Sequence, residues 1–304
     1  MSIIRGIRRK GLFKYIFGLP QGPVWIICDP LGLFFAGVTH FLIGYGVFAV
    51  MTITILPNPT LVRWIEFAVF VVFAYLAVTS HLKAMLTNPG TVPLGEDDDV
   101  LREYCEMYET DDEVADGEEN RRYCQRCEAP KPNRAHHCRT CRRCIRKADH
   151  HCIWVNNCVG ENNMKFFVLF NFYIFVISVL ALVYVVWHII DCAKTDWGEN
   201  CRYFSEVGTF LIMLFLFMEA VLFSMFCCTM GLSIISAIQW DETAIDRYKK
   251  RMAGGDATSI RKTEKKMTNF EAVFGRPRSL AWLSPLTVSR VGLYLQRKAT
   301  LHTV

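Results

Sequence analysis

The sequence lacks two features that would place it in common classes of exported or transport protein. It has no evident cleavable signal peptide, because its basic start is followed by Pro20 and Pro23 before any long apolar run. It also has little charge inside its apolar runs, where Glu66, His81 and Glu219 are too few, and mostly too near the ends, to favour a transport pathway. We therefore expect neither a cleaved leader nor a transporter.

Apolar residues make up 52% of the 304 residues and are concentrated in four blocks. These blocks are residues 31–56, 65–84, 166–190 and 207–237. A helix needs about 20 largely apolar residues to cross the hydrocarbon core of a bilayer. Three blocks exceed this length, and the second reaches it by extending to residue 84. The sequence therefore predicts an all-α polytopic membrane protein with four transmembrane helices.

These blocks divide the chain into six segments. In chain order they are a basic N-terminal tail (1–30), spans one and two (31–84), an acidic spacer (85–120), a cysteine-rich domain (121–165), spans three and four (166–238) and a C-terminal tail (239–304).

Lys and Arg residues near the ends of the spans predict the orientation of the chain in the membrane. Five of them lie in the first 14 residues. In contrast, the loop between spans one and two holds only Arg63, and the loop between spans three and four holds only Lys194 and Arg202. We expect both termini and the long middle segment to be cytosolic.

The cysteines are distributed unevenly. Seven of the thirteen lie between residues 121 and 165. The cytosol keeps thiols reduced, so this density indicates metal binding or catalysis and not disulfide bonds. Cys192 and Cys201 lie in the loop between spans three and four, and the sequence leaves open whether they form a disulfide bond.

The spacing of cysteines and histidines repeats after fourteen residues. One set follows the pattern Cys-x2-Cys-x9-His-x6-Cys, and the same pattern recurs fourteen residues later. Three cysteines and one histidine are a usual ligand set for one tetrahedral structural zinc ion. The sequence predicts two zinc sites with ligands Cys124, Cys127, His137 and Cys144, and Cys138, Cys141, His151 and Cys158.

Three residues of metal-binding types in this segment remain outside these sets: His136, His150 and Cys152. Asp149 precedes His150, so the stretch offers a thiol nucleophile, a base and a carboxylate to orient the base. Two alternatives stay open: Cys152 replaces one of the eight zinc ligands, or it is a plain buried thiol. The cysteine-rich domain ends directly before the third apolar block, where a reactive thiol can meet a lipid chain, as acyl transfer from a thioester requires.

The stretch "CQRC…KPNRAHHCRTCRRCIRKADHHCIWVNNCVGENN" resembles the cysteine-rich domain of the DHHC family of protein S-acyltransferases. Three further motifs are similar to the family's: "TNPG" (87–90), "TAID" (243–246) and "NFEAVFG" (269–275). The stretch "WDETAID" resembles the corresponding sequence of the family's Golgi-type subgroup. The chain departs from the family pattern at Ile153, where proline is usual, at Asn88 for Asp, and at Ala244 and Asp246 for Thr and Glu.

The resemblance implies roles for individual residues. Cys152 would be acylated by acyl-CoA and would pass the acyl group to a substrate cysteine in a ping-pong reaction. His150 would accept the thiol proton, and Asp149 would fix its tautomer. The two zinc sets found from spacing agree with the family's two structural zinc ions.

The acyl-CoA substrate suggests further contact residues. Its phosphates call for basic partners, and Trp154 could pack on the thioester or anchor the loop at the membrane. The basic candidates are Arg122, Lys131, Arg134 and His136; a solvated basic face is the alternative. Ile177 lies eleven residues into the third block, and the resemblance implies that this position helps to set acyl chain length. A lipid-facing isoleucine is the alternative there.

We expect the protein to act on cytosol-facing, cysteine-containing proteins from an endomembrane, with a Golgi location favoured. Its partners are acyl-CoA, those substrate proteins and the lipid bilayer, and no nucleic acid. The competing interpretation is a non-catalytic membrane scaffold whose zinc domain binds partners. RING spacing does not fit the fourteen-residue repeat, and a scaffold has no need of an Asp-His pair before an unligated cysteine.

Overall fold

The computed structural model describes residues 24–57, 59–92, 94, 123–194, 201, 205–252 and 266–287. Four helices in this part of the chain are long and apolar enough to cross a membrane. They are α2 (Pro30–Thr54), α3 (Leu61–Leu86), α5 (Met164–Lys194) and α6 (Glu206–Trp240). The prediction of four spans is confirmed. The division of the chain into six segments stays a prediction.

The chain separates into two compact units, which we describe one at a time. The helical unit comprises Ala36–His81 and Val168–Ile235, and the zinc unit comprises the described parts of Met1–Phe35, Leu82–Phe167 and Ser236–Val304.

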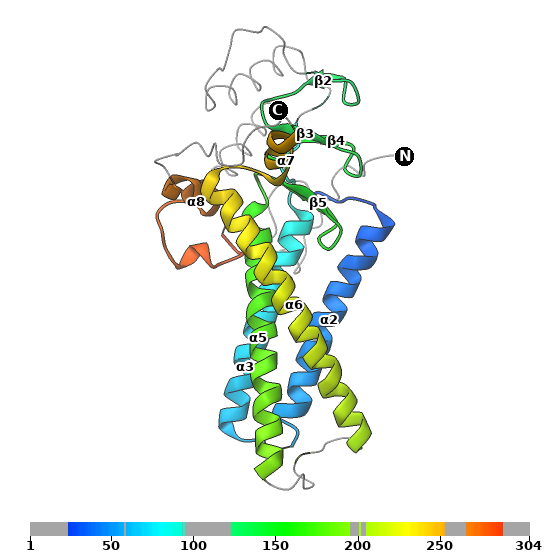
Figure 1. The fold of residues 1–304 in the computed structure, drawn as a ribbon, viewed down its shortest axis with the longest axis vertical. Coiled ribbons are helices and arrows are strands. Elements are labelled where there is room, and N and C mark those ends of the chain that lie inside the picture. Colours follow the sequence, from blue (N-terminus) through cyan, green and yellow to red (C-terminus); the bar gives the residue numbers. More distant parts are fainter. Residues whose placement is uncertain are drawn as a thin grey trace. The chain divides into compact units, whose positions relative to one another are not determined.

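Within the helical unit, segments of the four long helices run side by side (Figure 1). Polar contacts fix their pairing: the Tyr45 hydroxyl donates to the Ile212 carbonyl over 2.8 Å, and the Tyr184 hydroxyl donates to the Glu66 carbonyl over 3.0 Å. Because hydrocarbon offers no hydrogen-bond partner, such hydroxyls must find one inside the protein.

The zinc unit contains six short strands that the sequence did not predict. They are β1 (Tyr123–Cys124), β2 (Ala129–Pro130), β3 (Ala135–Cys138), β4 (Arg143–Arg146), β5 (His150–Cys152) and β6 (Asn157–Val159). They pair as three antiparallel hairpins, β1–β2, β3–β4 and β5–β6. Strands of two to four residues have almost no alternating pattern to detect.

The three hairpins repeat at the same fourteen-residue interval as the cysteines. Each is closed by a four-residue turn whose last residue has a positive φ: 50° at Glu128, 54° at Arg142 and 46° at Asn156. Few residues other than glycine adopt this left-handed conformation. Its recurrence shows that the repeat is one of backbone shape as well as of zinc ligands.

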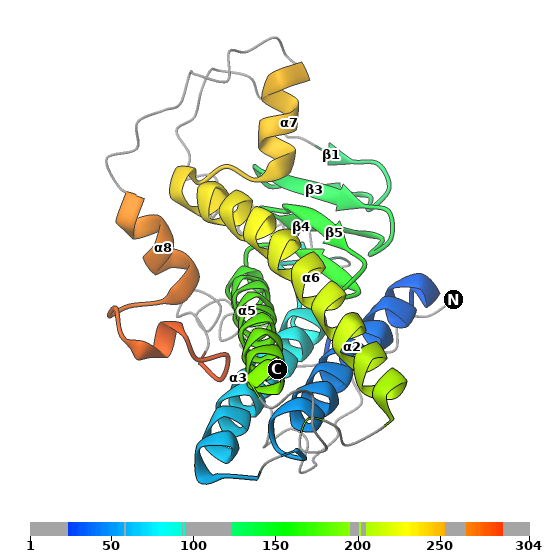
Figure 2. The same cartoon turned by 60° about the horizontal axis from the view of Figure 1, so that its bottom comes forward.

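The zinc unit also contains α7 (Ala244–Met252), α8 (Lys266–Phe274) and the short 3-10 helix η2 (Leu280–Trp282). Figure 2 shows α7 beside the hairpins, directly after α6 in the chain. Asn269 of the "NFEAVFG" motif donates its side-chain N–H to the Gln239 carbonyl over 3.3 Å. This bond satisfies a carbonyl in the last turn of α6, which has no partner within its own helix.

Candidate functional site

The first predicted ligand set comes together between the first two hairpins. The ligand atoms of Cys124, Cys127, His137 and Cys144 all lie within 4.8 Å of one another. The Nδ1 atom of His137 is 3.6 Å from the Cys124 sulphur and 3.2 Å from the Cys127 sulphur.

The second set, Cys138, Cys141, His151 and Cys158, has the same arrangement. The Nδ1 atom of His151 lies 3.6, 3.4 and 3.7 Å from the three sulphurs, in the order of the chain. In a tetrahedral zinc site with usual bond lengths, a nitrogen and a sulphur lie about 3.6 Å apart. Both sets therefore fit a zinc ion, and each supplies four protein ligands, which leaves no position for a reacting water.

Cys152 lies outside both sets, and the third hairpin explains why. The first strand of each hairpin ends on a cysteine: Cys124, Cys138 and Cys152. In the first two hairpins a second cysteine follows three residues later, but the third has buried Val155 at that position. Without a second thiol, this hairpin cannot form the two-cysteine turn that holds zinc in the other two. Cys152 therefore occupies the position that a zinc ligand has in the other two hairpins, but the second cysteine of the turn is absent.

Strand geometry separates the zinc ligand His151 from its two neighbours. Successive side chains of a strand point to opposite faces, whereas residues two apart share a face. In β5, His150 and Cys152 therefore share one face while His151 faces the zinc ligands. Cys152 is close enough to His150 to raise the pKa of the imidazole.

A carboxylate completes this group. The Nδ1 atom of His150 donates to Asp149 Oδ2 over 2.9 Å, and its ring packs edge-on against Phe167. Burial lowers the pKa of His150, but the hydrogen bonds to Asp149 and Cys152 outweigh it and raise the pKa to about 9. The imidazole is therefore cationic at neutral pH, and it lies beside the Cys152 side chain.

The second oxygen of Asp149 receives a bond from the far end of the chain. The backbone N–H of Ala244 donates to Asp149 Oδ1 over 2.6 Å. Ala244 is the first residue of α7, whose N-terminal N–H groups carry partial positive charge. Burial raises the pKa of Asp149, but the bonds from His150 and from Ala244 outweigh it and hold the pKa below its ordinary value.

The "TAID" motif forms the start of α7. The backbone N–H of Thr243 donates to Asp246 Oδ2, and the backbone N–H of Asp246 donates to Thr243 Oγ1, both over 3.2 Å. This reciprocal pair is a capping box, with Asp in the place where Glu or Gln is usual. The motif therefore fixes the direction in which the Ala244 N–H points.

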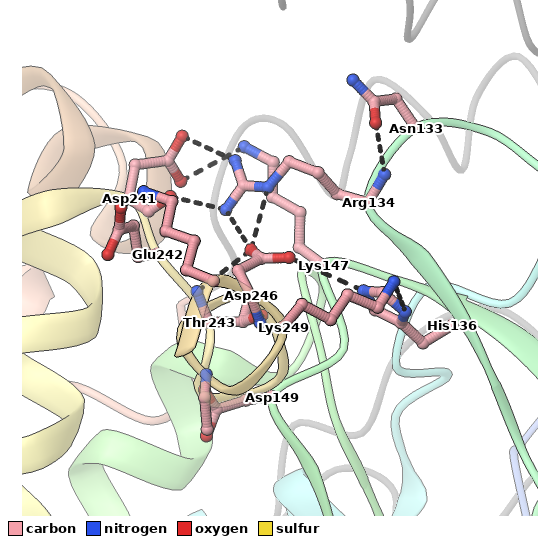
Figure 3. Close-up of polar contacts among 12 residues, drawn as sticks. Asn133, Arg134, His136, Lys147, Asp149, Asp241, Glu242, Thr243, Asp246 and Lys249 are labelled. Atoms are coloured by element: carbon pink, nitrogen blue, oxygen red, sulfur yellow. Dashed lines mark hydrogen bonds and ion pairs between the residues drawn. The ribbon is translucent and has the colours of Figure 1, made fainter. Parts of the chain in front are cut away.

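Arg134 locks α7 against the hairpins. Figure 3 shows its guanidinium between Asp241 and Asp246. One Nη atom lies 2.8 Å from Asp241 Oδ2, and the other lies 3.1 Å from Asp246 Oδ2. We call Arg134, Asp241 and Asp246 the arginine clamp. Lys147 joins it through Asp241 over 3.5 Å.

The other predicted substrate contacts are spread over the described chain, except for Arg122, which lies outside the described residues. Lys131 is half-buried near the zinc ligand His137. His136 lies beside the clamp, with Nε2 3.6 Å from Asp246 Oδ1 and Nδ1 3.3 Å from Lys249 Nζ. Ile177, in α5 of the helical unit, is only 7% exposed.

The turn after Cys152 contains Ile153 and Trp154. The Ile153 carbonyl accepts the backbone N–H of Asn156 over 3.3 Å, so the turn closes without the usual proline. The Trp154 ring packs edge-on against Phe35, with ring centroids 4.9 Å apart.

Sequence reasoning missed the asparagines after this turn. The side-chain N–H group of buried Asn157 donates to the carbonyls of Ala84, Met85 and Thr87 over 2.9–3.1 Å, and Asn163 donates to Ala84 over 3.0 Å. The Ala84 and Met85 carbonyls lie in the last turn of α3 and lack helical partners, and Thr87 directly follows the helix. The run "NNCVGENN" was the available signal, because amides are suited to capping a helix end. The pair holds β6 to the end of a membrane-spanning helix.

Comparison with known proteins is consistent with this geometry. Residues 117–251 match the family model described as DHHC palmitoyltransferase. The chain is 41% identical over 274 residues to palmitoyltransferase ZDHHC3 of Homo sapiens, covering 90% of this chain and 87% of the relative. It is 40% identical over 277 residues to ZDHHC7 of Mus musculus, covering 90% and 83%.

A plant relative matches at lower identity. Probable protein S-acyltransferase 12 of Arabidopsis thaliana is 32% identical over 227 residues, covering 71% of this chain and 72% of the relative. The extent and identity of these matches favour an acyltransferase over the non-catalytic scaffold. The chain therefore belongs to the DHHC palmitoyltransferase family of protein S-acyltransferases.

Proposed function

We propose that the protein takes a long-chain acyl group from acyl-CoA onto Cys152 and passes it to cysteines of other proteins. The observation that carries this assignment is the position of Cys152. It lies outside both zinc ligand sets and beside His150, which is held in turn by Asp149.

The side chains present can carry both half-reactions. In the first, His150 already holds the proton of Cys152, and the Cys152 thiolate attacks the thioester carbonyl carbon. The bond from that carbon to the CoA sulphur breaks, and CoA takes the proton from His150 and leaves as a thiol. In the second, the substrate thiol gives its proton to His150 and attacks the acyl group, and Cys152 leaves and is reprotonated.

The two zinc ions act as structural supports in this scheme. When bound, each would cross-link two hairpins, and the second set would also hold β5, the strand that carries Cys152. His151 lies between His150 and Cys152 in β5, so a metal ligated by it holds the strand that positions both.

For the CoA phosphates we propose Lys131 and His136, with Arg122. Arg134, predicted as a further phosphate contact, is committed to the carboxylates of the clamp. We propose that it acts in this scheme by fixing the region around His136. Trp154 would then pack close to the thioester, on the turn that follows Cys152.

We propose that Ile177 limits the acyl chain to about sixteen carbons. Eleven residues of helix correspond to about 16 Å. The burial of Ile177 supports a position inside the helical unit over one that faces lipid.

We further propose that both termini and the zinc unit face the cytosol, and that the protein resides in the Golgi. The basic tail and the dense reduced thiols of the zinc unit support this orientation. The substrates are then cytosol-facing proteins with accessible cysteines.

A two-step transfer experiment tests the function. The purified protein is loaded with labelled palmitoyl-CoA, separated from unreacted CoA ester and mixed with a peptide that contains one cysteine. The label should move to this peptide but not to the same peptide with serine, and Cys152→Ser should carry no label to transfer. Transfer that requires acyl-CoA to be present throughout would contradict the acyl-enzyme route.

A further inference from the structure

The helical unit contains a second cysteine pair that the acyl transfer scheme does not use. Cys192 lies in the last turn of α5, and Cys201 lies in the connection to α6. They are 1% and 6% exposed, although a loop between two spans usually exposes its side chains. Their side chains lie close enough to interact with each other.

A histidine accompanies this pair. The Nε2 atom of His188, one helical turn before Cys192, lies 3.6 Å from its sulphur. An imidazole at this position can accept the thiol proton, and the thiolate is the form that enters disulfide exchange.

The position of the pair in the chain decides its redox environment. One end of α5 follows the zinc unit, and Cys192 lies near the other end, so a membrane-spanning α5 places the pair and the zinc ligands on opposite sides. Zinc ligation and thioester exchange both require reduced sulphur, which the cytosol provides. The opposite side is the lumen of the secretory pathway, where disulfides form and persist.

We propose that Cys192 and Cys201 form an intramolecular disulfide on the lumenal side, joining the end of α5 to the segment that leads into α6. This inference rests on the orientation given under the proposed function. The reaction is an exchange with the disulfide of a lumenal thiol oxidoreductase or of oxidised glutathione. One cysteine thiolate attacks that disulfide and releases a thiol. The second then attacks the mixed disulfide, forming the S–S bond and releasing the other thiol. Two electrons and two protons pass to the oxidant.

A metal site is the less suitable alternative for these residues. Cys192, Cys201 and His188 offer three donor atoms, one fewer than a closed structural zinc site. Within the described residues, the groups of donors close enough for a metal ion are the two sets of the zinc unit.

Thiol counting on the full-length protein in microsomes tests the proposal. The sample is denatured with detergent, chelator and N-ethylmaleimide, which blocks every thiol. It is then reduced with a phosphine and labelled with a maleimide polymer that retards the protein on a gel. An acyl thioester on Cys152 is not cleaved by the phosphine and adds no label. The wild type should gain two labels that depend on reduction, and Cys192→Ser and Cys201→Ser should each lose both.

Cys227→Ser is the matched control, because Cys227 is equally buried but lies within α6. It should keep both labels.

Tryptic peptides of the unreduced wild type should contain residues 166–194 joined to residues 195–202, a result that does not depend on the folding of any variant. Failure to find reduction-dependent label would overturn the proposal, and so would a dimer on a non-reducing gel that Cys192→Ser removes. Because the readout is thiol chemistry, an inactive enzyme would not affect it.

Discussion

Replacing Asp149 with asparagine separates the role of its charge from that of its shape. In the wild type each carboxylate oxygen accepts one bond, from His150 Nδ1 over 2.9 Å and from the Ala244 N–H over 2.6 Å. Asparagine has the same size but offers one acceptor and one N–H donor group. One of the two donors, His150 Nδ1 or the Ala244 N–H, must then face the N–H group of the asparagine. Either α7 loses its contact, or His150 changes tautomer and presents its proton to Cys152.

The size of the effect follows from the bond that is lost. A hydrogen bond to a charged group contributes about 1.5–3 kcal/mol. If that amount is lost from the transition state, the rate of acylation falls about 10- to 150-fold, at about 1.4 kcal/mol for each tenfold. We therefore expect Asp149→Asn to acylate slowly but measurably.

The pH dependence should change as well. In the wild type, the bonds to Asp149 and Cys152 outweigh burial and raise the pKa of His150 to about 9. A raised pKa keeps the imidazole protonated below that value, and the proton for the departing CoA is lost above it. Removal of the carboxylate charge lowers this pKa. The fall of the acylation rate on the alkaline side should therefore begin at a lower pH in Asp149→Asn.

Single-turnover acylation with labelled palmitoyl-CoA, followed by rapid quenching over a range of pH, measures both effects. Zinc content is determined on the same samples and should be two per chain. Asp191→Asn is the control, because Asp191 is about half exposed and lies in the helical unit. Acylation of Asp149→Asn at the wild-type rate and pH profile, with both zinc ions retained, would refute the role given to the carboxylate.

Three further predictions concern the clamp, the metal and the acyl chain. Arg134→Gln leaves Asp246 partly buried without its cation and should lower the free energy of unfolding by about 1–3 kcal/mol; an unchanged chemical denaturation curve would show that the clamp contributes nothing. Cys144→Ser should reduce the zinc content from two per chain to one, and retention of both ions would mean that its ligand assignment is wrong. Ile177→Gly should raise the rate with stearoyl-CoA relative to palmitoyl-CoA, and an unchanged ratio would remove Ile177 as the limit on chain length.

The four spans could be predicted because a bilayer constrains composition directly. A spanning helix must be apolar over its whole length, and that property can be seen without knowing its neighbours. The zinc ligand sets could be predicted equally well, since their spacing repeats after fourteen residues. The structure brings together the eight residues that the spacing selected.

The hairpins and the surroundings of Asp149 could not be predicted in the same way. Strands of two to four residues have little propensity of their own, and their turns are fixed by ligands that meet at a metal. The bond from Ala244 to Asp149 joins positions 95 residues apart, and that from Arg134 to Asp241 spans 107. Local patterns carry no information on such pairs. The sequence indicated that "TAID" matters, but its capping box and its contact with Asp149 required the fold.

The assignment of Cys152 also became clearer with the structure. Spacing left open that Cys152 replaces a zinc ligand, since it follows Cys138 by fourteen residues. The third hairpin shows that it does occupy the equivalent position, but with Val155 in place of the second cysteine. Loss of one thiol from a repeated zinc-binding turn thus leaves a cysteine that is positioned by the same backbone and is available for chemistry.

The central claim is that Cys152 is the acylated nucleophile and is not a zinc ligand. The most direct measurement incubates purified wild type and Cys152→Ser with labelled palmitoyl-CoA, tests release of the label by neutral hydroxylamine, and counts zinc in both. We predict a hydroxylamine-labile label on the wild type, none on the variant, and two zinc ions per chain in each. Loss of a zinc ion from Cys152→Ser, or a stable label that persists in it, would contradict the account.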